Sequence, residues 1–185
     1  MIIYCTKQTL DRYNLKDILL NQEDKDYEKA TRESEESLLK WGAKLFYVNS
    51  RKCLALCHFE SKYTIFIYDL LKKDLKNLGF MIETYIEEFY KDDKQMDEAL
   101  RKYFRHCDVY FTCIHERSII STLNRNILDI DDGYDFYEFV EDRIFDSIAF
   151  NNDFMDRYLT KATNRKEYIY PKGEFKKLIL EYYSN

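Results

Sequence analysis

The chain has very few glycine and proline residues, 4 and 1 respectively among 185. Its turns must therefore rely on asparagine, aspartate and serine, which also favour turn conformations. Long hydrophobic runs are missing too, because no stretch approaches the roughly 20 apolar residues that a membrane-spanning helix needs. The first residues, MIIYCTKQ, contain no apolar segment of the kind found in signal peptides. We therefore expect a cytoplasmic protein without a membrane segment, in which the 5 cysteines are reduced thiols.

An excess of basic charge is absent as well. The chain has 29 lysine and arginine residues against 34 aspartate and glutamate residues, which gives a net charge of -5. Binding to duplex nucleic acid needs a basic footprint, so we do not expect general binding to duplexes. The chain is also rich in tyrosine, with 17 of them, and tyrosine is enriched at protein interfaces. This composition favours a protein partner.

Recognisable catalytic motifs are missing. The sequence has no Gly-rich phosphate loop, no G-x-S-x-G and no H-E-x-x-H. It therefore names no catalytic residue, and we expect no cofactor.

Each of the three histidines lies close to cysteines in the sequence. Cys53, Cys57 and His58 form one group, and His106, Cys107, Cys113 and His115 form the other. On a strand, the first two cysteines lie about 13 Å apart, at roughly 3.3 Å per residue, which is too far for both to bind one zinc ion. Cys113 and His115 share a strand face about 6–7 Å apart, but no third group is evident to orient a nucleophile–base pair. We interpret these residues as packing residues and expect no metal.

The hydrophobic fraction of 45% is typical of a globular protein, and 185 residues suffice for one domain with its own core. Residues 41–78 predict three alternating strands with two tight turns, followed by a helix. Its middle strand, from Cys53 to Phe59, is apolar on both faces, as a covered central strand should be. With Ile2–Cys5 and Asp108–Ile114 as further strands, we predict a single α+β domain over residues 1–185. Its small antiparallel sheet packs against about six helices.

The helices follow from apolar residues that recur with a period of 3.6. A helix from about Leu71 to Tyr90 is predicted by a stripe of residues that we expect to be buried: Leu71, Leu75, Leu78, Ile82, Tyr85, Ile86 and Phe89. Further helices are expected over Lys94–Arg105, after Ser118 as N-cap, over Phe136–Ile148 and Asp153–Leu159 with a break at Asn151 and Asn152, and from Pro171 onwards. Residues 21–37 are almost wholly polar, so we interpret them as an insert, either a solvated helix or a mobile connector.

Polar residues at the starts of these elements form the candidate ligand site. Arg51 and Lys52 lie at the turn just before the middle strand of the meander, while Arg117 and Ser118 open a later helix that also carries Asn124. A helix start offers free backbone N–H groups beside Arg117, which is a plausible cradle for an anion. These five residues are therefore the predicted ligand-binding set.

Short motifs spread along the chain have a characteristic order and spacing. They are Ile3, Cys5, Thr6 and Lys7; Trp41, Ala43, Leu45 and Phe46; Arg51, Lys52 and Cys53; Lys73, Asp74, Leu75, Asn77 and Leu78; and Arg117 and Ser118 followed by Leu123 and Asn124. In these motifs the chain resembles an uncharacterised family of small bacterial proteins, a domain of unknown function. The resemblance implies a shared fold and cytoplasmic residence, and it implies no activity.

Two functional hypotheses remain open. The first is a small acidic cytoplasmic binding or regulatory protein that acts by protein–protein contact, of the kind that a phage or plasmid carries as an inhibitor. The alternative is a nucleotide- or phosphate-binding domain or enzyme that uses Arg51, Lys52, Arg117 and Asn124. The alternative requires these residues to line one concave site, whereas the first hypothesis does not.

Overall fold

The computed structural model describes residues 1–15, 19, 37–105, 108–133, 147–158, 160–161 and 168–183. The predicted polar insert therefore lies outside the described residues, apart from Ser37. The described elements are, in chain order, β1 (Ile2–Cys5), α1 (Lys7–Tyr13), the 3₁₀ helix η2 (Ser37–Leu39), β2 (Lys40–Val48), β3 (Arg51–His58), β4 (Thr64–Ile67), the 3₁₀ helix η3 (Lys72–Asn77), α3 (Leu78–Phe89), α4 (Lys94–Tyr103), β5 (Tyr110–Cys113), α5 (Arg117–Gly133), α7 (Ser147–Arg157), β6 (Thr160–Lys161), β7 (Tyr168–Ile169) and α8 (Pro171–Tyr183). Six α-helices and a small sheet among these residues confirm the predicted α+β class.

The main sheet has five strands in the order β4-β3-β2-β1-β5. The predicted meander is confirmed, because β3 pairs antiparallel with both β2 and β4. The prediction of a wholly antiparallel sheet is wrong, since β1 runs parallel to both β2 and β5. Parallel neighbours need a long crossover, and the chain between Cys5 and Lys40 is long enough to provide one. Alternation of side chains along a strand carries no information about the direction of its neighbours.

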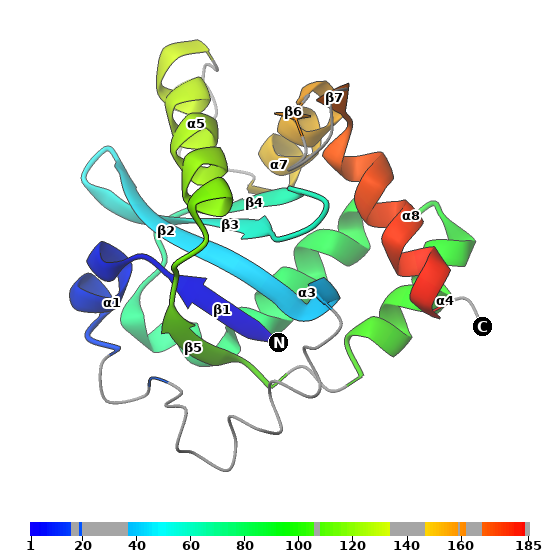
Figure 1. Ribbon diagram of the computed structural model, residues 1–185, viewed down its shortest axis with the longest axis horizontal. Helices are drawn as coiled ribbons and strands as arrows, with labels where there is room; N and C mark the ends of the chain where they lie inside the picture. The colour runs from blue at the N-terminus through cyan, green and yellow to red at the C-terminus, as the bar shows by residue number, and fades with distance from the viewer. Residues whose placement is uncertain are drawn as a thin grey trace.

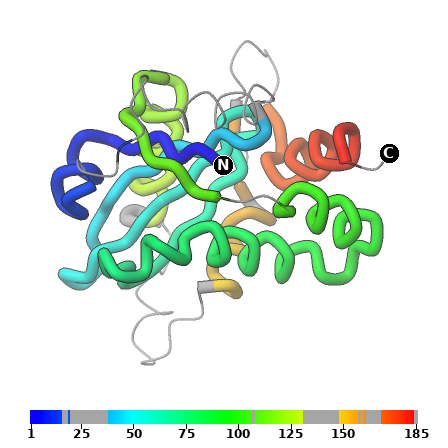
Figure 2. Tube along the Cα trace, turned by 90° about the horizontal axis from the view of Figure 1, so that it is seen from below, coloured from blue at the N-terminus to red at the C-terminus, as the bar shows by residue number. Residues whose placement is uncertain are grey.

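Helices cover both faces of the sheet (Figure 1). Cross-strand pairing puts Gly42 and Cys57 on one face, and Trp41 and His58 on the other. The first face packs against α5, which crosses β2 and β3. The second face meets α3, α4 and α8, and the last two of these lie side by side (Figure 2).

Helix α7 runs along the free edge of β4 and pairs with it through a side chain. The Asn151 Oδ1 accepts from the Phe66 backbone N–H at 2.7 Å, and its Nδ2 donates to the Phe66 carbonyl at 2.8 Å. One side chain thus makes the two hydrogen bonds that another strand would make, which protects an edge otherwise open to pairing. The predicted helix break at Asn151 and Asn152 is wrong. Both lie within α7, because asparagine there satisfies a tertiary partner instead of ending the helix. Residues 134–146, most of the first helix predicted there, lie outside the described residues.

The predicted helix from Leu71 to Tyr90 is present in two parts. It opens as the 3₁₀ helix η3 and continues as α3. Leu75, Leu78, Ile82 and Ile86 are buried as expected, Tyr85 and Phe89 are only half-buried, and Leu71 is exposed. The prediction for Leu71 is wrong because this residue comes just before the first helical residue, Lys72. Its backbone is extended, with φ -95° and ψ 158°, and its N–H is held by the Asp74 carboxylate.

Phe175 of α8 is the centre of a buried aromatic cluster. Its ring is fully buried. Five rings from β2, β3, the residue before β4, the end of α3, and α4 lie with their centroids 5.0–6.3 Å from it: Trp41, His58, Tyr63, Tyr90 and Tyr103. Aromatic pairs at such distances add to the hydrophobic gain of burial. One side chain therefore ties the last helix to the sheet and to two other helices.

We expect Phe175→Ala to lower the free energy of unfolding by about 3–5 kcal/mol, because it removes a fully buried ring and leaves a cavity. Chemical denaturation followed by fluorescence of Trp41 measures this change. Phe80, also on a helix but 70% exposed, is the matched control. Phe80→Ala should cost less than about 0.5 kcal/mol. Equal losses in the two variants would contradict the central role of Phe175.

Gly42 lets α5 approach the sheet closely. A Cβ atom at this position would lie 2.2 Å from the Ile119 Cγ2 and 3.3 Å from the Ile114 Cδ1. These separations are shorter than van der Waals contact, so the helix could not keep its present position over a larger residue.

Gly42→Ala should therefore destabilise the protein by about 1–3 kcal/mol through overpacking. The loss should be smaller when Ile119→Ala is also present, so a double-mutant cycle measured by chemical denaturation should show favourable coupling. Gly173→Ala is the control, since its Cβ would meet no atom within 4 Å. In a helix this change should be neutral or stabilising by up to about 1 kcal/mol. If the losses in unfolding free energy are simply additive, the contact with Ile119 is not the reason why position 42 requires glycine.

Candidate functional site

The predicted residues Arg51 and Lys52 lie where β3 begins, next to the hairpin turn at Asn49 and Ser50. An Arg51 Nη1 lies 3.2 Å from the Asp69 Oδ2 in an exposed ion pair. The Lys52 ammonium lies 5.5 Å from the centroid of the Tyr13 ring. Both cations therefore have partners within the protein.

The predicted anion cradle at the start of α5 is filled by the chain's own carboxylate. The Glu116 Oε1 accepts from the Ser118 backbone N–H at 3.3 Å and from the Ser118 hydroxyl at 3.0 Å. Ser118 is not the N-cap, because the helix already begins at Arg117. Asn124, two turns further on, accepts a hydrogen bond from the Lys44 ammonium.

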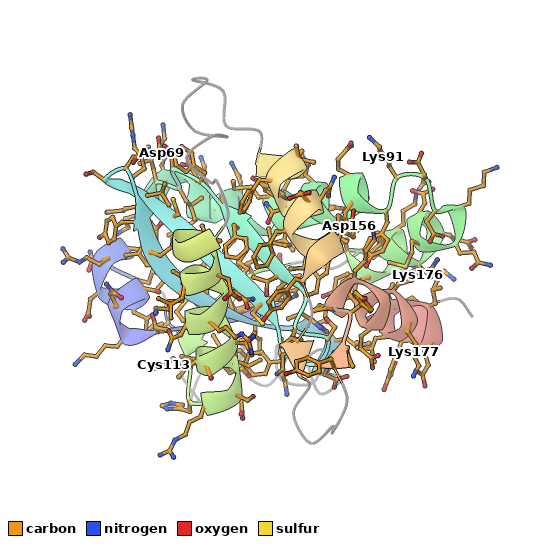
Figure 3. The ribbon with its side chains drawn as sticks, turned by 90° about the horizontal axis from the view of Figure 1, so that it is seen from above. Asp69, Lys91, Cys113, Asp156, Lys176 and Lys177 are labelled. Atoms are coloured by element: carbon orange, nitrogen blue, oxygen red, sulfur yellow. The ribbon has the colours of Figure 1, made fainter. Side chains whose placement is uncertain are left out.

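The structure does not bring the five predicted residues into one site. Arg51 and His58 mark the two ends of β3, about 23 Å apart at roughly 3.3 Å per residue. Glu116 lies beyond the His58 end, where its charge acts on Lys62. Figure 3 likewise shows Asp69, the partner of Arg51, far from Cys113, which precedes the start of α5. A site shared by all five is excluded, and ligand binding by any of them separately stays a prediction.

The described thiols are mostly core residues, as expected. Cys5, Cys53 and Cys57 are buried, and Cys113 is half-buried. Burial raises the pKa of Cys5 to about 12, helped by the neighbouring Cys113, and burial raises the pKa of Cys53 and of Cys57 to about 11. Protonated thiols are poor nucleophiles, so these three suit packing better than catalysis.

His58 is held neutral inside the protein. Its Nε2 lies 2.9 Å from the Leu38 carbonyl oxygen and so donates to it, while its Nδ1 accepts from the Ser61 backbone N–H at 3.2 Å. The Leu38 carbonyl also accepts from the Tyr103 hydroxyl at 2.7 Å, and that hydroxyl accepts from the Trp41 indole N–H at 3.1 Å. Burial lowers the pKa of His58 from 6.5 to about 4, and the charge of Lys62 acts in the same direction.

A groove, here called the α8 groove, opens where the end of α3, the start of α4, α7 and the start of α8 meet. Its volume is about 650 Å³, within the range of ligand-binding pockets. Aromatic and charged side chains share its walls, and its lining residues are Phe89, Tyr90, Asp92, Asp93, Lys94, Gln95, Met155, Asp156, Tyr170, Lys172, Gly173 and Lys176.

Two ion pairs cross this groove. The Lys172 ammonium lies 2.5 Å from an Asp156 carboxylate oxygen and 4.3 Å from the centroid of the Phe89 ring. Lys176, one turn along α8, pairs with Asp93. Figure 3 shows Asp156 and Lys176 on the same side of the molecule, far from Asp69. The hydrogen bond from Lys176 lowers the pKa of Asp93, and burial opposes this.

Further hydrogen bonds fix the positions of the residues that line the groove. The Asp93 carboxylate also caps α4, accepting from the Met96 N–H at 3.3 Å. The Tyr90 hydroxyl donates to the Lys172 carbonyl at 2.7 Å, which holds the start of α8 against the end of α3. Sequence reasoning missed this site. The only available signals were the acidic pair before α4 and two lysines four residues apart after Pro171, and no signal linked Asp156 to either.

Among the described residues, no group of three or more histidine, cysteine, aspartate or glutamate side chains is arranged to hold a metal ion. His106 and Cys107, from the second histidine–cysteine group, lie outside that part of the chain. No described helix combines the length and apolar character needed to cross a membrane.

The neutral state of His58 makes stability depend on pH. The unfolded chain binds a proton at this ring below about pH 6.5, whereas the folded chain resists it down to about pH 4. The free energy of unfolding should therefore fall as pH drops through this window, by up to about 3 kcal/mol. Urea midpoints measured from pH 7 to 4 test this. His58→Gln should flatten the dependence, and the exposed control His115→Gln should not. The same slope in all three proteins would contradict the assignment.

Comparison with known proteins gives a family and no function. No curated protein and no solved structure matches the chain. A family model described as "Domain of unknown function (DUF6933)" matches residues 2–174, which is most of the chain. The resemblance seen in the sequence motifs is thereby confirmed, and the chain belongs to the family of domains of unknown function DUF6933.

Proposed function

We propose that this protein is a binding protein that acts by contact between the α8 groove and a protein partner. The observation that carries the proposal is the groove itself, which is large, charged and flanked by exposed tyrosines. Tyr168 and Tyr170 are 65% and 60% exposed, and they lie two residues apart where β7 leads into α8. Tyrosine offers a large, rigid contact surface with a polar tip, which suits it to protein interfaces.

The chemistry of the groove supports contact more than catalysis. Its described lining residues include no serine, threonine, cysteine or histidine, and two of its three carboxylates, on Asp93 and Asp156, are each paired with a lysine. Lys172 and Lys176 are each paired with a carboxylate, and such pairing favours the charged ammonium over the neutral amine that a nucleophilic lysine requires.

The proposal extends to biological role. A regulatory protein of the cytoplasm, carried by a phage or plasmid as an inhibitor, would act by contact and need no reaction of its own. The net charge of -5 supports this part of the proposal, since an acidic surface can compete for a basic surface on its target.

Substituting both exposed tyrosines tests the proposal. We expect a host protein that copurifies with the wild type to be lost, or recovered at least about tenfold less, with Tyr168→Ser/Tyr170→Ser. Two interface tyrosines commonly contribute more than 1 kcal/mol each. Affinity capture with quantitative mass spectrometry, followed by calorimetry with the purified partner, measures this loss.

The matched control for this experiment is Tyr47→Ser. Tyr47 is an exposed tyrosine on β2, near the hairpin and away from the groove. The Tyr47→Ser variant should recover as much of the host protein as the wild type does. Recovery of no protein by the wild type, or equal recovery by the double variant, would refute the proposed function.

A further inference from the structure

One segment that borders the α8 groove is strongly acidic. Residues 83–98 contain seven acidic residues and two lysines, a net charge of -5 that equals the charge of the whole chain. The segment, here called the acidic ridge, comprises the second half of α3, the turn after it and the first turns of α4. Its acidic residues are Glu83, Glu87, Glu88, Asp92, Asp93, Asp97 and Glu98.

Much of this charge is not neutralised within the described part of the chain. Three of the carboxylates have ion-pair partners: Glu88 with Lys91, Asp97 with Arg101, and Asp93 with Lys176. The other four, on Glu83, Glu87, Asp92 and Glu98, have none there, and the one remaining cation of the ridge is Lys94. Burial and then the like charge of Glu87 raise the pKa of Glu83, as expected where repulsion is uncompensated.

The ridge runs directly into the α8 groove. Asp92, Asp93 and Lys94 belong to both, so the acidic segment continues into the lining of the groove. The groove's own lining has equal numbers of aspartate and lysine. The sign of the potential at its mouth is therefore set by the ridge, and a basic partner would be attracted there.

The groove already binds one ammonium group of the chain itself, that of Lys172, and the lysine of a partner could be bound by the same kinds of contact. Lys172 lies over the face of the Phe89 ring with its charge against Asp156. An aromatic face beside a carboxylate is a favourable environment for a lysine or arginine side chain. Tyr170 and Asp92, an aromatic ring and a carboxylate, also line the groove, and both are exposed.

We propose that the α8 groove and the acidic ridge receive a basic peptide segment of a protein partner, whose lysine or arginine side chains lie on Tyr170 and against Asp92 and Glu87. This inference rests on the proposed function and adds the chemistry of the partner. An acidic ligand fits less well, because Lys172 and Lys176 are already paired and the unpaired carboxylates of the ridge would repel it.

Binding of a simple basic peptide tests the proposal. The probes are fluorescein-labelled peptides of alternating lysine and glycine, or of alternating glutamate and glycine, measured by fluorescence anisotropy with the full chain. We expect saturable binding of the lysine peptide at about 0.05 M salt that weakens strongly by about 0.5 M. The glutamate peptide should not bind. No binding of the lysine peptide, or equal binding of both, would overturn the proposal.

Charge-matched variants separate the ridge from the general acidity of the protein. Glu87→Gln/Asp92→Asn should weaken the lysine peptide by about 3–10-fold, the range expected for charges at an interface rim. Asp11→Asn/Asp69→Asn removes two charges away from the groove, on α1 and beside Arg51 (Figures 1 and 3). Asn tolerates the positive φ of 50° at position 69. This control should change the affinity less than twofold, and an equal effect of the two double variants would overturn the proposal.

The outcome also distinguishes this inference from the proposed function. If the lysine peptide fails to bind while Tyr168→Ser/Tyr170→Ser still loses a copurifying partner, the groove binds a protein and only the basic character of that protein is wrong.

Discussion

The docking of α8 through the Phe175 ring is the contact on which the rest of this structure depends. Phe175 lies among rings supplied by the sheet and by the ends of α3 and α4. The walls of the α8 groove come from the end of α3 and the start of α4 on one side and from α7 and α8, much further along the chain, on the other, so the groove depends on the docking of α8. Tyr90 serves both purposes, since its ring packs on Phe175 while its hydroxyl holds the start of α8. The same residues that pack the core therefore also shape the candidate binding surface.

The polar groups beneath this cluster are satisfied inside the protein, and this limits what they can do. The Leu38 carbonyl accepts from both His58 and Tyr103, and Tyr103 accepts in turn from Trp41. A network with every donor and acceptor paired fixes the relative positions of its elements and leaves none free for a ligand. The residues open to a partner are instead those at the surface of the groove, where charge and exposed rings occur together. The interior fixes the shape of this protein, and the proposed preference for a basic partner depends on the charge of the ridge.

Much of the fold could be predicted from the sequence because it depends on local periodicity. The alternation around Cys53 and Cys57 identified a central strand, and the stripe from Leu75 to Ile86 identified a helix. The predictions were wrong where the local structure depends on residues that are distant in sequence. The parallel pairing of β1 depends on how the chain crosses over, and Asn151 sits within α7 because its amide pairs with Phe66. Local patterns contain neither fact.

The candidate site was the least predictable part. Arg51 and Arg117 were chosen for their local surroundings, yet Arg51 lies at one end of β3 and Arg117 follows Glu116, which lies beyond the other end. By itself, the sequence determined the class of fold, the burial of Cys5, Cys53 and Cys57, and the family to which the chain belongs. Only the tertiary structure decided that Asp93, Asp156, Lys172 and Lys176 share one groove and that the acidic ridge borders it. The physical reason is that periodicity reports which face of an element is buried, whereas a binding surface depends on which faces meet.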